Sequence, residues 1–165
     1  MARGRVLRFG TGEVVTVLRS GADTGGALFE FETVLPPGRG PPAHLHLYER
    51  ETFTVVQGRL VVRLGRDRFE LGPGEHAEVP PTVAHTFDNC TGEPVRFVTR
   101  STPAGVLEEL LRAADGHRWW PLLDIAEINH GSRASLFLAC VPLWPQRAVL
   151  NGLAALARLR SGRRL

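Results

Sequence analysis

Glycine and proline residues divide the first hundred residues of this chain into short segments of alternating polarity. Most of the 18 glycines and 12 prolines of the 165-residue sequence lie before residue 105. Over residues 28–35, for example, Phe29 and Phe31 alternate with Glu30 and Glu32. A period of two is typical of β-strands with one buried face. Many short strands at such spacing predict an antiparallel barrel or sandwich.

The strands and turns can be placed approximately from this pattern. A proline- and glycine-rich loop is expected over residues 36–42, and tight turns over 65–67 and 72–74. We expect strands over residues 13–18, 28–35, 43–47, 52–57, 59–64, 68–71, 76–79, 84–88 and 95–102. The fold class predicted from these segments is mainly β.

The pattern changes after Pro103, where apolar residues begin to recur at helical spacing. We expect helices beginning near Pro103, over residues 122–129 and over residues 146–160. The chain is therefore interpreted as a β-barrel domain over residues 1–102 and a helical appendage over residues 103–165. The appendage is expected to pack on the barrel or on a partner subunit, and Trp119 and Trp120 are expected to make one such contact.

The charge pattern gives no indication of a nucleic-acid partner. The sequence has a formal net charge of +3, and all its permanently basic side chains are arginine. We attribute the absence of lysine to codon bias in a GC-rich genome, which favours a bacterial origin. The arginines cluster only in a short tail at residues 158–164, and such a tail is usually solvated. We therefore expect no binding to nucleic acid.

Cysteine content and apolar runs favour a cytoplasmic protein without a membrane span. Cys90 and Cys140 form no C-x-x-C pair, and two cysteines are too few for a secreted disulfide scaffold. The first residues lead into a strand-like pattern rather than an apolar signal core. The most apolar run, residues 134–144, is interrupted by Pro142 and ended by Pro145.

Four ligand-type residues are spaced so that their side chains can meet. His44 and His46 are two positions apart on a predicted strand, so both face the same side. Glu51 lies at an odd offset from His46, which would place it on the opposite face of an unbroken strand. A turn through residues 48–50 would instead deliver Glu51 from the start of the next strand. His85 would approach from a later strand.

Three imidazoles and one carboxylate facing one point would suit a divalent metal ion. Four protein ligands leave two positions of an octahedral ion open, as catalysis requires. Glu49 is an alternative carboxylate, although it falls in the predicted turn. The other histidines, His76, His117 and His130, are interpreted as non-ligands.

Two segments of the sequence resemble the two motifs of the cupin family. The first motif, G-x5-H-x-H-x4-E-x6-G, is matched at every defined position. The second, G-x5-P-x-G-x2-H-x3-N, is matched except at Thr82, where the family usually has glycine. The resemblance covers roughly residues 25–102 and implies a double-stranded β-helix, the cupin or jelly-roll barrel. The matched positions are Gly38, His44, His46, Glu51 and Gly58 in the first motif, and Gly74, Pro80, His85 and Asn89 in the second.

The resemblance implies roles for the matched residues. It makes His44, His46, Glu51 and His85 the ligands of one divalent transition metal, and Asn89 a structural residue. The metal could be iron, manganese, nickel, copper or zinc, because the ligand set suits each of them.

Tyr48 could donate a hydrogen bond beside the metal, but a position at the rim is favoured. The aromatic residues Phe29, Phe31, Phe53 and Phe87 line a ligand pocket or fill the core, and the small barrel favours the core.

The resemblance limits function less than fold, because cupins host many chemistries. The function we favour is a dioxygenase similar to quercetinase, acting on a small chelating enol, catechol or diketone, with Glu51 also serving as a catalytic base. The alternatives are a non-oxidative metal-dependent isomerase or cyclase and a non-catalytic ligand-binding barrel. A homodimer is expected, because an open barrel has sheet edges to protect.

Overall fold

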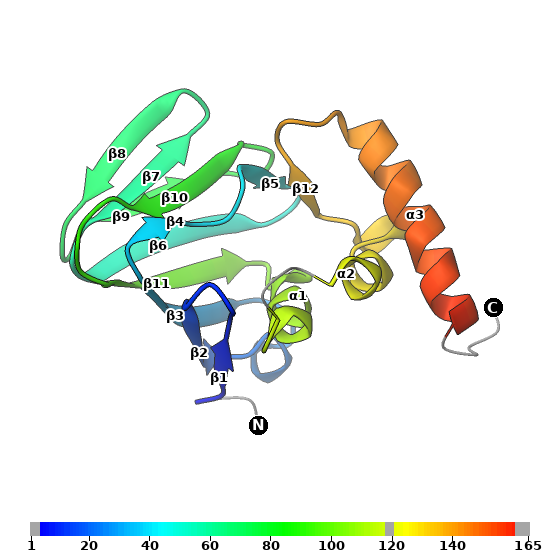
Figure 1. The fold of residues 1–165 in the computed structure, drawn as a ribbon, viewed down its shortest axis with the longest axis horizontal. Coiled ribbons are helices and arrows are strands. Elements are labelled where there is room, and N and C mark those ends of the chain that lie inside the picture. Colours follow the sequence, from blue (N-terminus) through cyan, green and yellow to red (C-terminus); the bar gives the residue numbers. More distant parts are fainter. Residues whose placement is uncertain (1–3, 118–120, 161–165) are drawn as a thin grey trace.

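The computed structural model describes residues 4–117 and 121–160 (Figure 1). The predicted contact of Trp119 and Trp120 lies outside the described residues. Two antiparallel sheets face each other and form the larger part of the described chain (Figure 1). The mainly β fold predicted from the sequence is confirmed.

The first sheet has six strands, and the interior residues of its long strands alternate with exposed ones. On its central strand, for example, Val95, Phe97, Thr99 and Ser101 are all buried. The order in this sheet is β1 (Val6–Arg8), β2 (Val14–Arg19), β3 (Phe29–Leu35), β11 (Val95–Thr102), β6 (Arg50–Gln57) and β9 (His76–Val79).

The second sheet is shorter and contains strands from distant parts of the chain. Its order is β12 (Leu136–Leu138), β5 (His44–His46), β10 (His85–Asn89), β7 (Leu60–Leu64) and β8 (Asp67–Leu71), and β4 (Gly38–Arg39) pairs with β10 off this path. The strands β7 and β8 form a hairpin that turns at Gly65, whose φ is 57°. Glycine adopts this left-handed conformation without steric cost.

The apolar residues separate into two clusters. The first lies between the sheets and contains three aromatic rings, Phe53, Phe87 and Phe97, with ring centroids 5.1–6.1 Å apart. The second lies where helix α1 (Leu107–Ala114) covers the β1–β3 end of the first sheet and contains Phe29 and Phe31. Phe29, Phe31, Phe53 and Phe87 therefore all fill cores, as expected for a small barrel.

Helix α1 is attached to the first sheet through one buried carboxylate. Glu108 accepts hydrogen bonds from the Ser20 hydroxyl at 2.9 Å and from the backbone N–H of Gly21 at 2.8 Å. Arg112, one turn further along the helix, also donates to Glu108. These partners offset the desolvation of the charge and fix the junction between barrel and helix.

The segment after Pro103 contains three helices, as expected, and also a short strand that the sequence pattern did not predict. It contains α1, α2 (Leu122–Ile128), a 3₁₀ turn (Gly131–Arg133), the strand β12, and α3 (Leu143–Arg160). A second 3₁₀ turn (Ala22–Thr24) follows β2. Helix α3 begins three residues before the predicted start at residue 146. Pro145 lies in its first turn, where a missing N–H costs no helical hydrogen bond.

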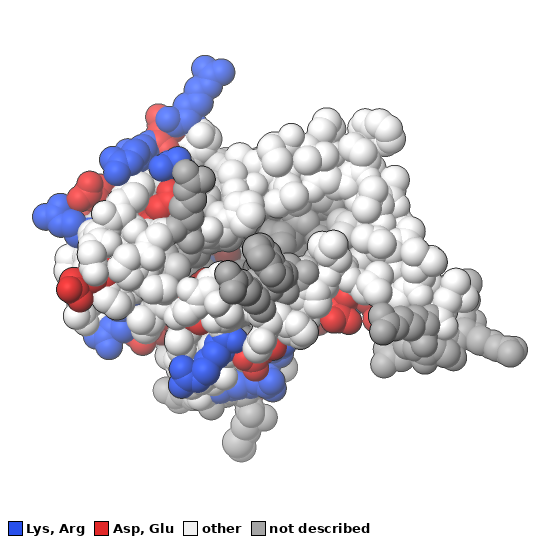
Figure 2. Space-filling view, viewed as in Figure 1, with Lys and Arg blue, Asp and Glu red and all other residues white. Residues whose placement is uncertain are grey.

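The outer surface of α3 is largely apolar. Trp144 and Leu159 on this helix are 77% and 78% exposed. Figure 2 shows charged side chains over the β7–β8 hairpin and near β1, whereas the region over α3 in this view carries none. In the described part of the chain, the structure contains no helix that is both long and apolar enough to span a membrane.

Candidate metal centre

Three strands bring the four predicted ligands together inside the barrel. His44 and His46 lie at the two ends of β5, Glu51 is the second residue of β6, and His85 is the first residue of β10. A bend at residues 47–48 ends β5 before β6 begins, so Glu51 returns to the same side as the histidines. The turn expected from the odd offset of Glu51 is therefore present.

The four side chains offer ligand atoms that all lie within 4.8 Å of one another. The Oε2 atom of Glu51 is 2.9 Å from Nε2 of His85 and 3.4 Å from Nε2 of His46. An ion bound about 2.1 Å from each ligand atom would place neighbouring ligand atoms roughly 3 Å apart. His46, Glu51 and His85 are at most 3% exposed, whereas His44 is only partly buried, so the group can be reached from outside only at His44.

Backbone carbonyls fix the orientation of two of the imidazole rings. Nδ1 of His44 lies 2.8 Å from the carbonyl oxygen of Pro42, and Nδ1 of His85 lies 3.0 Å from that of Val83. A carbonyl only accepts, so each Nδ1 carries the proton and donates it. This tautomer leaves Nε2 of His44 with a free lone pair, which is the arrangement that metal-binding histidines generally show. Nε2 of His85 faces the Oε2 atom of Glu51 at 2.9 Å, and a bound ion would take the place of the proton between them.

The electrostatics of the group favour a positive charge at its centre. Burial and the neighbouring imidazoles lower the pKa of His44 to about 4, so this ring is neutral at pH 7. Burial alone would raise the pKa of Glu51, but the neighbouring His46 and His85 hold it well below its usual range. Burial would lower the pKa of His46, yet the Glu51 carboxylate raises it. The raised pKa means that His46 tends to hold a proton, whose positive charge balances the Glu51 carboxylate. A divalent cation would supply that positive charge instead.

One buried nitrogen supports the same reading. Nε2 of His46 is buried and makes no well-formed hydrogen bond in the described structure, since the Oε2 atom of Glu51 is 3.4 Å away. A buried polar atom without a partner costs roughly 1–3 kcal/mol, so such atoms usually have a function. The donor set, the separations and this unpartnered nitrogen all fit a divalent transition ion.

Glu49 lies close to this group without joining it. The group of potential ligands found in the described residues contains Glu51 and not Glu49. Glu49 is only 2% exposed, and a Cβ placed on Gly105 would approach its Oε1 to 1.9 Å. Its carboxylate therefore packs against the junction before α1, where it contributes to the raised pKa of His46.

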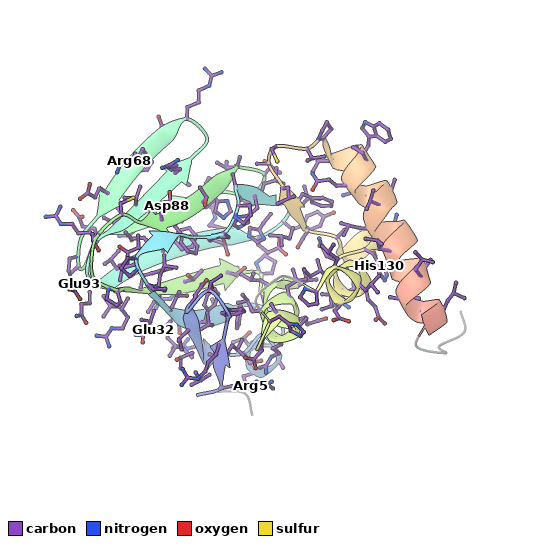
Figure 3. All side chains as sticks on the ribbon, in the orientation of Figure 1. Arg5, Glu32, Arg68, Asp88, Glu93 and His130 are labelled. Carbon is purple, nitrogen blue, oxygen red and sulfur yellow. The ribbon has the colours of Figure 1, made fainter. Side chains whose placement is uncertain are left out.

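The remaining sequence candidates lie outside the group. His76 is exposed on β9. His117 follows α1, where its N–H bonds the carbonyl of Ala114. Figure 3 shows His130 beside α3, where Arg158 contacts its ring. Tyr48 is 57% exposed, which places it at the rim.

Asn89 and Thr82 have structural roles next to the ligands. The Asn89 side chain donates to the carbonyls of Leu35 and Glu93 at 3.0 and 2.8 Å, as expected for a scaffold residue. Thr82 has a φ of 67°, the left-handed region, which explains why the related motif has glycine at this position. Its backbone N–H donates to the carbonyl of His46 at 2.6 Å, so the strained turn holds a ligand strand.

Sequence reasoning did not identify two supports of the centre. The carbonyls of Pro42 and Val83 orient imidazoles, but a backbone acceptor leaves no trace in residue identity. The strand β12, which pairs with β5, was also missed. Its only signal was the apolar run over residues 134–144, which was too short and irregular to indicate a strand.

Comparison with known proteins gives the following matches. A family profile described as "Cupin domain" matches residues 31–99. The quercetin 2,3-dioxygenase of Bacillus subtilis is 34% identical over 91 residues, which are 50% of this chain and 26% of that protein. The polyketide synthase CurC of Streptomyces cyaneus is 31% identical over 90 residues, 54% of this chain and 56% of that protein. The chain thus spans less than two thirds of the length of these relatives.

Solved structures share the fold at low sequence identity. An RmlC-like cupin from Shewanella frigidimarina has a TM-score of 0.53 and 20% identity, covering 61% of this chain and 85% of that one. A predicted oxalate decarboxylase from Thermotoga maritima has a TM-score of 0.52 and 20% identity, covering 55% and 80%. At these identities the likeness concerns the fold alone.

Proposed function

The chain is a small member of the cupin superfamily, and from this premise we propose that it is a metal-dependent enzyme acting on a small molecule. The observation that carries the proposal is the buried group of His44, His46, Glu51 and His85. These residues would hold one divalent transition ion. On an octahedral ion, four protein ligands would leave two coordination positions open for a substrate.

The reaction we propose is a dioxygenase-like oxidation of a chelating enol, catechol or diketone. The bound ion would supply a Lewis acid, and for a redox metal an electron-transfer partner, to the substrate oxygens and to O₂. The sequence similarity to quercetin 2,3-dioxygenase supports this reaction, although it covers about a quarter of that protein. The ring of Phe53, whose centroid lies 6.0 Å from that of His85, keeps the centre apolar on one side, which favours a planar, weakly hydrated substrate.

Glu51 has two proposed roles that its environment supports unequally. As a ligand it must be ionised, and its lowered pKa ensures this at neutral pH. As a catalytic base it must accept a proton from the substrate, and the same low pKa makes it a weak acceptor. The base role therefore requires that substrate binding separates Glu51 from His46 or His85.

A non-oxidative reaction is the second candidate, and one observation favours it. The similarity to polyketide synthase CurC extends over 54% of this chain and 56% of that protein, the more balanced of the two matches. A polyketide chain is rich in diketone and enol groups. The same chelating substrate class could therefore undergo cyclisation or isomerisation without O₂, with the ion acting only as a Lewis acid.

Metal content of the untagged full chain tests the first part of the proposal. We expect about one equivalent of a transition ion in the unaltered protein and a loss of affinity of more than about 100-fold in His85→Ala. The matched control is His76→Ala, which removes an exposed histidine from β9 outside the group and should retain the metal. No metal uptake by folded protein after reconstitution would contradict the site and leave a non-catalytic ligand-binding barrel.

Oxygen consumption separates the two reactions. The iron-, manganese-, nickel- and copper-loaded forms are each supplied with a flavonol and a linear diketone in an oxygen electrode. Uptake of O₂ with consumption of substrate supports the dioxygenase. Anaerobic conversion that also occurs with Zn²⁺ would instead support the non-oxidative reaction.

The assembly state and compartment remain predictions. A homodimer in the cytoplasm is still expected, and the exposed apolar residues Trp144 and Leu159 of α3 offer one surface for a second subunit. Size-exclusion chromatography with light scattering would measure the assembly state directly.

A further inference from the structure

The strand that carries two of the four candidate ligands is held mainly by the C-terminal appendage. Strand β5 shares a single registered pair with β10, between His44 and His85. With β12 it shares three pairs, in which His46 lies opposite Leu136 and His44 opposite Leu138. The residues matched by the cupin profile end at residue 99, so β12 lies outside the family domain.

Further backbone hydrogen bonds extend this pairing past both ends of β5. The N–H of Leu47 donates to the carbonyl of Ser135 at 2.8 Å, and the N–H of Ala139 donates to the carbonyl of Ala43 at 2.9 Å. On the opposite side of β5, the N–H of Thr82 bonds the carbonyl of His46. The appendage therefore supplies an entire neighbouring strand, while the rest of the barrel supplies isolated contacts.

A single buried side chain fixes the start of β12. Asn129, 1% exposed, follows α2 and bonds the backbone of two consecutive residues. Its Oδ1 accepts from the N–H of Ser135 at 2.8 Å and from that of Leu136 at 3.1 Å, and its Nδ2 donates to the carbonyl of Leu136 at 2.5 Å. Leu136 is the residue that pairs with His46. The Asn129 side chain therefore holds the backbone residue that lies directly opposite a candidate ligand.

We propose that Asn129 is a positioning residue of the metal centre, acting through β12 to set the orientation of His44 and His46. Its three hydrogen bonds determine the register of β12, and that register determines where β5 can lie. Because the side chains at both ends of β5 point at the ion site, a small rotation of this three-residue strand moves two ligand atoms together. The inference rests on the metal site proposed above.

Cobalt binding to the metal-free full chain tests this role. Co²⁺ serves as the probe because its visible absorption reports ligand geometry as well as occupancy. We expect Asn129→Ala to bind Co²⁺ about 10–100-fold more weakly than the unaltered protein, the range seen when partners of metal ligands are removed. Its absorption spectrum should also change in position and intensity. Asn129→Asp keeps an acceptor for the two N–H groups and should recover part of the affinity.

A matched control comes from the same appendage. Asn151 on α3 accepts a hydrogen bond from the N–H of Gly131, in the 3₁₀ turn rather than in β12, so Asn151→Ala should leave cobalt affinity and spectrum unchanged. Circular dichroism verifies that each variant is folded. If Asn129→Ala does not fold, the comparison is made with Asn129→Asp. A lower melting temperature with unaltered affinity and spectrum in the folded Asn129 variants would overturn the inference alone. Failure of the unaltered protein to bind Co²⁺ would overturn the metal site together with it.

Discussion

Gly40 lies where the loop before β5 crosses β10, and enlarging it should disturb both stability and the metal site. A Cβ at this position would stand 2.1 Å from the carbonyl oxygen of Phe87 and 2.8 Å from Cδ2 of its ring. A carbon and an oxygen atom in normal contact are roughly 3.4 Å apart. In Gly40→Ala the loop must therefore move by more than about 1 Å, because the obstructing oxygen belongs to the backbone of β10.

The change in the free energy of unfolding of Gly40→Ala has three parts, two destabilising and one stabilising. Movement of the loop breaks the hydrogen bond from the Gly40 N–H to the Phe87 carbonyl, worth about 1 kcal/mol. Overpacking against the Phe87 ring adds roughly 1–3 kcal/mol. The lower entropy of the unfolded alanine chain returns about 0.4–1 kcal/mol. We expect a net destabilisation of about 1–3.5 kcal/mol, which for a chain of this size lowers the melting temperature by roughly 2–14 °C.

The same movement should reach the ligands. The loop also provides the Pro42 carbonyl that orients His44, and it accepts a hydrogen bond from Thr86 at the Pro41 carbonyl. We therefore expect cobalt affinity to fall by about tenfold in Gly40→Ala. Denaturant unfolding in EDTA measures stability without metal, and a cobalt titration measures affinity.

Gly92→Ala is the matched control for this substitution. A Cβ at Gly92 would have no atom within 4 Å, so this variant should unfold within about 0.5 kcal/mol of the unaltered protein or be slightly more stable. Equal stabilities of Gly40→Ala and Gly92→Ala would refute the reasoning, because the two differ only in the space around the added methyl group.

Two further predictions concern strain and charge. Thr82→Gly should raise stability by about 0.5–1 kcal/mol in urea unfolding, because relief of the left-handed φ, worth roughly 1–2 kcal/mol, exceeds the entropy cost of glycine; a loss of stability would show that the Thr82 side chain makes contacts that outweigh its strain. Burial raises the pKa of Glu13 to about 7, so the folded chain holds this proton more tightly than the unfolded chain does. The protonated Glu13 carboxyl therefore contributes its full stabilisation below pH 4.5, and this contribution is lost as the pH rises through 7. Because Glu13 is partly exposed, we expect a loss of about 1–2 kcal/mol rather than the full value of about 3. Between pH 5 and 7.5 the free energy of unfolding should therefore fall more steeply with pH in the unaltered protein than in Glu13→Gln. Equal pH dependence of the two unfolding free energies would contradict the burial of this carboxyl.

The candidate ligand group could be predicted partly from local rules and partly from the resemblance to the cupin motifs, which alone assigned His85 to it. His44 and His46 share a face by the period of two, and the odd offset of Glu51 required a turn, which the structure contains. The bounds of most strands were recovered within a few residues, since strands such as β2, β6 and β11 alternate between buried and less buried residues, whereas the short strands β1 and β4 were not expected. Local periodicity alone thus fixes the interior surface of the barrel.

What the sequence could not supply are contacts between segments with no local signature. The residues of β12 become a strand only because β5 offers an unpaired edge, and Leu136–Leu138 is too short to show a period. Asn129 reads as an ordinary residue at the end of a helix. The need for glycine at position 40 comes from the carbonyl of Phe87, which lies 47 positions further along the chain. Each of these depends on tertiary packing rather than on neighbours in sequence.

The pairing of β5 with β12 also determines when the centre can be completed during synthesis. The two strands are about 90 residues apart in the sequence. Because chains emerge from the ribosome N-terminus first, the barrel strands are available well before β12. Until then β5 presents a bare edge of the kind that invites pairing with other chains. We therefore expect chains truncated before residue 135 to aggregate and to bind metal poorly, because the proposed metal site is completed only once β12 has been synthesised.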